Sequence, residues 1–234
     1  ENFMSRWSDI IVTINREDYG NVLRMHCHDV RYIPSVEVGI DRFHNVKVNR
    51  VEYRQALGLC SDDFVVLAVS EISARKNQKV IAEALSRHRS PNAAFVVCGN
   101  CIMGTETKRE IKELVLRSCV DIRFLGRHSD VAAICKCNDV GVLSSTREGL
   151  GLTGIEMLVV GLSVVGSGVH GIPNYLIDGY NGFLCDPHDA DAFATTIGLP
   201  CDNDLRRQFG VDKSARCMAR IYQDILGRGD AACA

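Results

Sequence analysis

Along residues 64–197, short apolar runs alternate with segments in which apolar residues recur three or four positions apart. The runs have the length and β-branched content of buried strands, and the segments between them have the period of helices packed on one face. Six strands are expected, at residues 64–70, 93–99, 122–126, 140–145, 162–168 and 182–186. Helices are expected at residues 77–88, 107–118, 129–138, 150–161 and 189–197, with a short one near 172–179. This order predicts an α/β fold, a doubly wound Rossmann-like parallel sheet with helices on both faces.

The first 45 residues do not continue this alternation. Residues 8–22 predict one strand and one helix, and residues 29–44 predict an irregular connector. Because a single strand–helix unit cannot bury a core of its own, we interpret residues 1–45 as the remnant of a preceding N-terminal domain and its linker. Residues 46–226 are then the Rossmann-like domain, and residues 227–234 a disordered tail.

Composition and charge narrow the class of protein. The 234 residues are 46% hydrophobic and 24% charged, with a formal net charge of −2. This is an ordinary soluble composition, and it lacks the basic footprint of a nucleic-acid-binding protein. No apolar run reaches the roughly 18 residues of a membrane span, and no signal peptide leads the sequence. The sequence begins with Glu1 rather than Met, which we interpret as the sign of an incomplete chain.

Eleven cysteines are scattered along the chain, and there is no N-x-S/T glycosylation site. A reducing cytoplasm is therefore the expected compartment. Cys98-x-x-Cys101 and Cys135-x-Cys137 have spacings that zinc sites use, and a His-Cys-His run stands at residues 26–28. A zinc site needs two such pairs to meet in space, and Cys98 is expected to end a buried strand. We therefore expect no metal site.

Glu156 lies inside the expected helix 150–161, whose apolar residues cover nearly every direction around its axis. A helix that is apolar all round is buried, and an ionised carboxylate there costs several kcal/mol unless a partner hydrogen-bonds it. One interpretation is an ion pair with a neighbouring Arg or Lys. The other is a ligand with two adjacent hydroxyl groups, from which one carboxylate can accept two hydrogen bonds.

A second carboxylate, Glu148, ends the loop before this helix, and Gly149-Leu150-Gly151 opens the helix. The free amide groups at a helix N-terminus stabilise an anion by about 0.3–2 kcal/mol. The chain thus offers a carboxylate, an anion site and a second carboxylate in order. A nucleoside diphosphate sugar carries its sugar, pyrophosphate and ribose in the same order.

The segment "REGLGLTGIE" (147–156) resembles the E-x7-E motif of the family 4 retaining glycosyltransferases, whose GT-B fold has two facing Rossmann-like domains. Four more segments are similar to that family in the same order: "RYIP…VGIDRF" (31–43), "VVLAVSEISARKN" (65–77), "FLGRHSDVAAICKCNDVGVLSS" (124–145) and "GSGVHGIPNYLIDGYNGFLCDP" (166–187). The resemblance covers nearly the whole chain. It implies the C-terminal, donor-binding half of a GT-B enzyme of the capsular or exopolysaccharide type.

The resemblance assigns roles to matching positions only. Glu148 would bind hydroxyl groups of the transferred sugar, and Glu156 the ribose diol. The backbone of Gly149, Leu150 and Gly151 would hold the diphosphate. These roles follow from the family and not from the spacing itself.

Lys76 matches the phosphate-binding lysine of the family, and its charge would stabilise the leaving diphosphate. The plainer alternative is a solvated lysine at the start of a helix. Glu148 and Lys76 are thus the candidate catalytic residues. Ser70 and Arg75, in the segment that matches the phosphate loop, and the backbone near Arg127 are candidate contacts to the donor. The family needs no divalent metal, so no cofactor is expected.

The implied partners are a nucleotide-sugar donor, UDP-linked by preference, a saccharide or lipid-linked acceptor, and the missing N-terminal domain. The implied role is in polysaccharide biosynthesis in the cytoplasm. Peripheral association of a full-length form with a membrane stays open, and no nucleic acid is expected.

The sequence also departs from the family. Glu71 stands where the family often carries an arginine, which reverses the charge beside the anion site, and Arg75 and Arg147 are the alternatives for supplying that charge. Asn174 replaces a frequent glutamate, and His170 is interpreted as a polar loop residue. Two other functions therefore stay open. One is a truncated or decayed nucleotide-binding module without turnover. The other is a different GT-B enzyme such as a UDP-sugar 2-epimerase, which the E-x7-E spacing disfavours.

Overall fold

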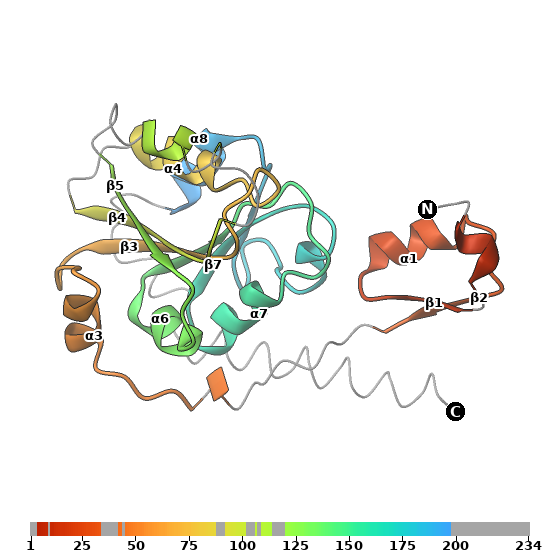
Figure 1. Cartoon of the computed structure of the whole chain (residues 1–234), viewed down its shortest axis with the longest axis horizontal. Coiled ribbons are helices and arrows are strands. Elements are labelled where there is room, and N and C mark those ends of the chain that lie inside the picture. Colours follow the sequence, from red (N-terminus) through yellow and green to blue (C-terminus); the bar gives the residue numbers. More distant parts are fainter. Residues whose placement is uncertain are drawn as a thin grey trace.

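A six-stranded parallel sheet forms the centre of the main domain in the computed structural model (Figure 1). The structure describes residues 4–8, 10–33, 42–43, 45–87, 92–101, 106, 109–113 and 120–197. The strands are β3 (Phe64–Val69), β4 (Ala93–Cys98), β5 (Asp121–Gly126), β6 (Val140–Leu143), β7 (Ser163–Ser167) and β8 (Phe183–Cys185). Their spatial order is β5-β4-β3-β6-β7-β8, and every neighbouring pair is parallel. The doubly wound sheet predicted from the sequence is confirmed.

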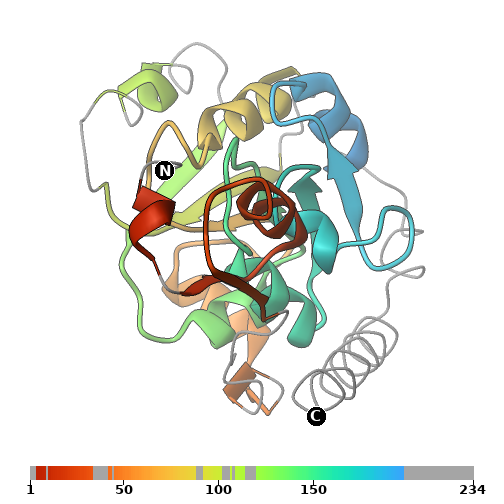
Figure 2. The same cartoon turned by 90° about the vertical axis from the view of Figure 1, so that its right-hand side faces the viewer.

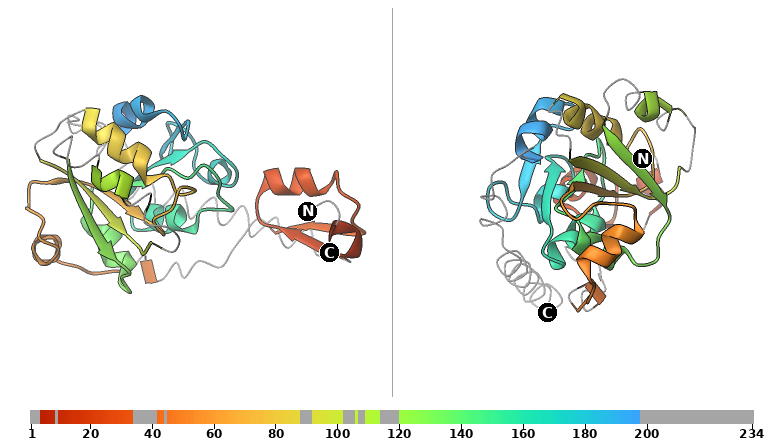
Figure 3. Two further views of the ribbon diagram at one scale, coloured as in Figure 1. Left: turned by 45° about the horizontal axis from the view of Figure 1, so that its top comes forward. Right: turned by 90° about the vertical axis from the view of Figure 1, so that its left-hand side faces the viewer.

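Helices cover both faces of this sheet (Figures 1 and 3). One face carries α4 (Gln78–Arg87) and α8 (Ala190–Ile197), and the other carries α3 (Arg50–Ala56), α6 (Val131–Cys137) and α7 (Leu152–Val159). Alternation along β3 divides the core between the faces: Val66 and Ala68 pack with α4 and α8, whereas Val65 and Leu67 pack on the opposite side. Both faces of the central strands are therefore buried, as a parallel sheet requires.

The expected helices are largely found, with three differences. The short helix near 172–179 is a 3₁₀ turn, η2 (Ile172–Asn174). Of the helix expected at 107–118, residues 109–113 are described and helical. The helix α3 was not expected, because its sequence, RVEYRQA, has too few apolar residues to show a period. Residues 198–226 of the expected domain and the expected tail at 227–234 lie outside the described residues.

The N-terminal unit, residues 4–33, lies apart from the sheet in Figure 1 and in front of it in Figure 2. It consists of η1 (Met4–Trp7), β1 (Ile10–Thr13), α1 (Arg16–Val22) and β2 (Asp29–Tyr32). The interpretation of residues 29–32 as irregular connector is wrong, since they form β2 and pair in parallel with β1. The Tyr32 ring packs against the Tyr19 ring of α1 at 5.6 Å, and such long-range packing leaves no clear period in a charged four-residue strand.

A buried ion pair fastens α3 to the amino-terminal edge of the sheet. Asp139 accepts from the Arg54 guanidinium at 2.6 Å and from the backbone N–H of Val65 at 2.8 Å, and both side chains of the pair are 1% exposed. Arg54 also donates to the carbonyls of Cys137, Ser61 and Asp63. Burial opposes ionisation, but the Val65 N–H and the charge of Arg54 outweigh it and lower the pKa of Asp139.

No helix among the described residues is both long enough and apolar enough to cross a membrane.

Removing the Asp139 carboxylate is expected to destabilise the domain. Asp139→Ala leaves the Arg54 charge buried without its partner, which costs about 3–5 kcal/mol. Because the folded-state pKa of Asp139 is lowered, its contribution is present above the ordinary aspartate pKa and is lost as the pH falls through the lowered value. Urea unfolding of the parent and the variant from pH 7 to pH 2.5 measures both effects. The exposed Asp62→Ala variant is the control, and equal midpoints for all three proteins at pH 7 would contradict this account.

Candidate functional site

The site lies where the strand order reverses, between the neighbouring strands β3 and β6. Ligands of open α/β sheets bind at this position, beyond the carboxyl ends of the strands. A cavity of about 360 Å³ opens there, within the range of small-molecule sites. Its lining residues are Ile14, Ala68, Val69, Ser70, Lys76, Gln78, Val142, Leu143, Ser144, Ser145, Glu148, Leu150, Gly151, Leu152 and Thr153.

An ion pair between Lys76 and Glu148 stands on the cavity wall. The Lys76 ammonium donates to Glu148 Oε2, and Ser145 Oγ donates to the same oxygen at 3.0 Å. The two side chains are only 17% and 10% exposed, so each charge is largely removed from water. The main chain is fixed as well, because Ser144 Oγ donates to the Lys76 carbonyl at 2.9 Å. The loops that follow β3 and β6 are thereby joined.

The helix α7 begins directly at the cavity. Gly151, its N-cap residue, has φ +74°, a left-handed conformation that favours glycine, and it supplies no capping side chain. A Cβ at Gly151 would lie 3.0 Å from Tyr175 Oη and 3.2 Å from Glu148 Cγ, so the position is also crowded. Tyr175 Oη donates to the Gly151 carbonyl at 2.9 Å and holds this turn in place. The next two residues, Leu152 and Thr153, line the cavity, where the first amide groups of α7 can meet an anion.

Glu156 lies farther along α7 and is not part of the cavity lining. It is half-buried, and its side chain makes no hydrogen bond or ion pair with any residue that the structure describes. Burial raises the pKa of Glu156, and the charge of Arg42 partly opposes this shift. The alternative of a direct ion pair with a neighbouring Arg or Lys therefore finds no partner in the described part of the chain.

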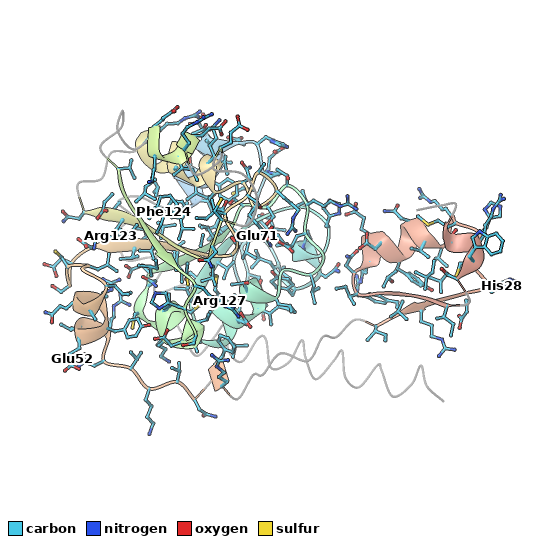
Figure 4. All side chains as sticks on the ribbon, viewed as in Figure 1. His28, Glu52, Glu71, Arg123, Phe124 and Arg127 are labelled. Carbon is cyan, nitrogen blue, oxygen red and sulfur yellow. The ribbon has the colours of Figure 1, made fainter. Side chains whose placement is uncertain are left out.

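The remaining predicted residues lie around this core of the site. Ser70 lines the cavity, and its hydroxyl accepts from Gln78 Nε2 at 2.9 Å. Arg75 lies outside the lining; its guanidinium pairs with Glu71 at 2.9 Å and comes within 3.9 Å of a Glu148 oxygen. Arg127, exposed just after β5, is not part of the lining. Figure 4 labels Glu71 and Arg127.

Five of the nine predicted residues thus line one cavity, and the other four are not among its lining residues. The lining set is Ser70, Lys76, Glu148, Leu150 and Gly151, and the others are Arg75, Arg127, Gly149 and Glu156. Gly149 is exposed, and its carbonyl accepts from Asn15 Nδ2 at 3.0 Å.

Sequence reasoning missed several residues of the site. Gln78, buried at the start of α4, also donates to the Glu71 carbonyl at 2.6 Å and shapes the loop after β3. Ile14 reaches the cavity from the N-terminal unit, and Tyr175 reaches α7 from the loop after β7. The one local signal in the sequence was a glutamine at the start of an expected helix, next to a basic loop. Ile14 and Tyr175 reach the site only through long-range packing.

The cysteine spacings do not form a cluster. Among the described residues, no group of three or more His, Cys, Asp or Glu side chains is arranged to hold a metal ion. Cys98, Cys135 and Cys137 are buried in apolar surroundings. His28 lies in the N-terminal unit, away from the main sheet (Figure 4).

Comparison with known proteins identifies the family. Residues 49–212 match the family model described as glycosyl transferases group 1, and the chain belongs to this family. It is 31% identical over 202 residues to EpsD of Bacillus subtilis, a protein assigned to the glycosyltransferases, over 84% of this chain and 52% of that relative. It is 27% identical over 243 residues to a D-inositol 3-phosphate glycosyltransferase of Xylanimonas cellulosilytica, over 94% and 58% of the two chains.

Among solved structures, the chain is similar to HepE of Anabaena in complex with UDP and glucose, with a TM-score of 0.85 and 18% identity. The match covers 100% of this chain and 65% of the HepE chain. This likeness shows that the parallel sheet is half of a GT-B fold. The chain spans about half the length of the curated relatives it matches.

Replacing Glu156 is expected to stabilise the protein. Because its folded-state pKa is raised, the ionised form is disfavoured in the folded protein, and this penalty grows as the pH rises above the ordinary value of 4.5. Solvent at the exposed side limits the gain from Glu156→Gln to about 1 kcal/mol, or roughly 2–4 °C in Tm at pH 7.5.

Thermal unfolding at pH 7.5 and pH 4 checks this expectation, with the exposed Glu52→Gln variant of α3 as the control. The gain of Glu156→Gln should shrink at pH 4, where the parent is also protonated. A lower Tm for Glu156→Gln at pH 7.5 would show that the carboxylate has a stabilising partner.

Proposed function

We propose that this chain is the donor-binding half of a retaining glycosyltransferase of family 4. The full protein would transfer a sugar from a nucleotide diphosphate sugar, UDP-linked, to a saccharide or lipid-linked acceptor. The observation that carries the proposal is the placement of a largely buried lysine beside the open N-terminus of α7 in one cavity at the strand reversal. A cation and a helix N-terminus together favour an anion such as a diphosphate.

The sugar and diphosphate of the donor would occupy the cavity, and the nucleoside would extend beyond it along α7 towards Glu156. The diphosphate would lie between Lys76 and the backbone amide groups of residues 150–153, which extends the predicted site at 149–151 into the first turn of α7. Glu148, held by Ser145, would accept hydrogen bonds from hydroxyl groups of the sugar. Glu156, the second acidic residue of the motif, would accept from the ribose hydroxyls, which supply the hydrogen bonds that its half-buried carboxylate lacks among the described residues.

The ion pair between Lys76 and Glu148 would have to open before Lys76 can act on the diphosphate. Before the donor binds, Glu148 neutralises Lys76, so the diphosphate competes with a carboxylate for the ammonium group. Once the diphosphate has taken this position, Lys76 stabilises the negative charge that develops on the leaving group as the glycosidic bond breaks. The chain's own cationic groups would supply this charge, so we propose no requirement for a divalent metal or another cofactor.

The choice of UDP rests on similarity. HepE, whose sheet superposes on that of this chain, is described in complex with UDP and glucose. We propose that acceptor binding requires a further domain facing this cavity, because the chain corresponds to about half of its relatives. The retaining mechanism is what the resemblance of the Glu148–Glu156 segment to family 4 implies.

One observation favours a nucleotide-binding module without turnover as the second candidate. Glu71 places a negative charge next to the loop of Lys76, and it binds Arg75 at 2.9 Å. A cation that could reach a phosphate is thereby already engaged, which reduces the positive charge that the leaving group would meet.

Calorimetric titration with UDP, GDP and ADP tests the proposed function. We expect UDP to bind the chain with a dissociation constant of about 0.1 mM, equivalent to about −5.5 kcal/mol, and with the same affinity in the presence of EDTA. GDP and ADP should bind more weakly. Silence with all three nucleotides would contradict both candidate functions.

Two glutamate variants separate the roles within the site. Glu156→Ala should weaken UDP binding about tenfold, because the ribose hydroxyls lose their acceptor. Glu148→Ala should leave UDP binding unchanged or tighter, since Lys76 is no longer neutralised, yet it should abolish the preference for UDP-glucose over UDP. Titration of the parent and both variants with UDP and UDP-glucose measures these effects. Parent-like binding by both variants would show that the two assignments are wrong.

A further inference from the structure

The first turn of α1 contacts two loops of the main domain at once. Asn15 Nδ2 donates to the Gly149 carbonyl at 3.0 Å, and Glu17 lies 3.3 Å from His170 Nδ1. Gly149 belongs to the loop after β6, and His170 to the loop after β7. Figure 2 shows the N-terminal unit lying over this side of the sheet.

Asn15 is fully buried although it is polar. Its Oδ1 accepts from the Asp18 N–H at 2.7 Å and caps α1, and its Nδ2 donates to Asp18 Oδ2 at 2.6 Å. The second N–H of the same amide is left to reach Gly149. A buried amide is stable only when its groups are paired, and the bond to Gly149 ties the N-terminal unit to the loop after β6.

The Gly149 carbonyl is enclosed on its other side as well. A Cβ at Gly171 would lie 1.9 Å from this oxygen, so the loop after β7 packs directly on it. Next to Gly171, His170 has φ +51°, an uncommon conformation for a residue with a side chain, and it faces Glu17. Ile14, immediately before Asn15, lines the cavity, and its Cδ1 would lie 3.8 Å from a Cβ at Gly149.

We propose that Asn15 is a positioning residue for the nucleoside diphosphate sugar. By holding the Gly149 carbonyl, it sets the path of the chain into Gly151 and aims the first amide groups of α7 at the cavity, while Ile14 forms the wall that the N-terminal unit contributes. This inference rests on the proposed function of the cavity. It goes further by assigning the N-terminal unit a direct part in donor binding.

The test compares Asn15→Asp with Asn21→Asp in the full 234-residue chain. Asp at position 15 has the size of Asn and keeps the oxygen that caps α1, but at pH 8 it has no N–H to donate. It then sets a carboxylate against both the Gly149 carbonyl and the Asp18 carboxylate. Asn21→Asp makes the same chemical change on an exposed position of α1. Circular dichroism verifies that both variants keep their helices.

Hydrogen exchange in the nucleotide-free proteins gives the first measurement. We expect the amides of residues 149–154 to exchange about tenfold faster in Asn15→Asp than in the parent, and at the parent's rate in Asn21→Asp. Because no nucleotide is present, this outcome does not depend on the proposed function. Equal exchange in all three proteins would overturn the inference.

UDP titration from pH 8 to pH 5 gives the second measurement. At pH 8, Asn15→Asp should bind UDP about tenfold more weakly than the parent at the same pH. The deficit should shrink as the pH falls towards 5, because burial and the facing Asp18 carboxylate favour protonation of the new carboxyl, which can then donate a hydrogen bond again. A general loss of structure would not recover in this way, and Asn21→Asp should follow the parent throughout. Parent-like UDP affinity in Asn15→Asp would refute the positioning role alone, whereas a parent that binds no nucleotide would refute the proposed function alone.

Discussion

The ion pair between Lys76 and Glu148 joins the loops of the two central strands at the point where the order of the sheet reverses. Parallel strands bring their carboxyl ends to one edge, so two loops that are far apart in sequence must meet there. Their main chains are fixed to each other, as the Ser144 hydroxyl binds the Lys76 carbonyl and the Thr146 N–H binds the Arg75 carbonyl at 2.9 Å. The position of α7 and the shape of the cavity both depend on this junction.

Charges alternate along this junction in the order Glu71, Arg75, Glu148 and Lys76. Each partly buried charge thus has a partner before any ligand arrives, which limits the cost of removing it from water. The same pairing sets the affinity for an anion, because an incoming diphosphate must displace a carboxylate that already holds the lysine. The negative charge of Glu71 is paired with Arg75, so it is not left uncompensated beside the anion site.

Close packing around α7 leaves no room for a side chain at its glycine positions. Tyr175 Oη would lie 2.3 Å from a Cβ at Gly154 and holds the Gly151 carbonyl, so the helix is seated directly on the loop after β7. Glu156 remains the exception in this packed region, because its carboxylate is half-buried without a partner among the described residues. A half-buried carboxylate without a partner in the folded chain is expected where a ligand supplies the missing contacts.

The apolar periods of the sequence determined the six strands, four of the helices and the doubly wound topology, because each strand must be buried on both faces and each helix on one. The same patterns placed Glu148, the Gly149–Gly151 turn and Glu156 around the start of α7, since these positions are neighbours along the chain.

Tertiary structure alone decided how these elements meet. Lys76 and Glu148 are 72 positions apart, Arg54 and Asp139 are 85 apart, and Asn15 and Gly149 are 134 apart. Such pairs leave no local period, because they depend on how successive crossovers bring strand ends together and on where the N-terminal unit packs. The sequence by itself therefore determined that the loops after β3 and β6 and the start of α7 form the site. The packing of the folded chain added the N-terminal unit and determined which side chains face one another, because these contacts join residues far apart in the sequence.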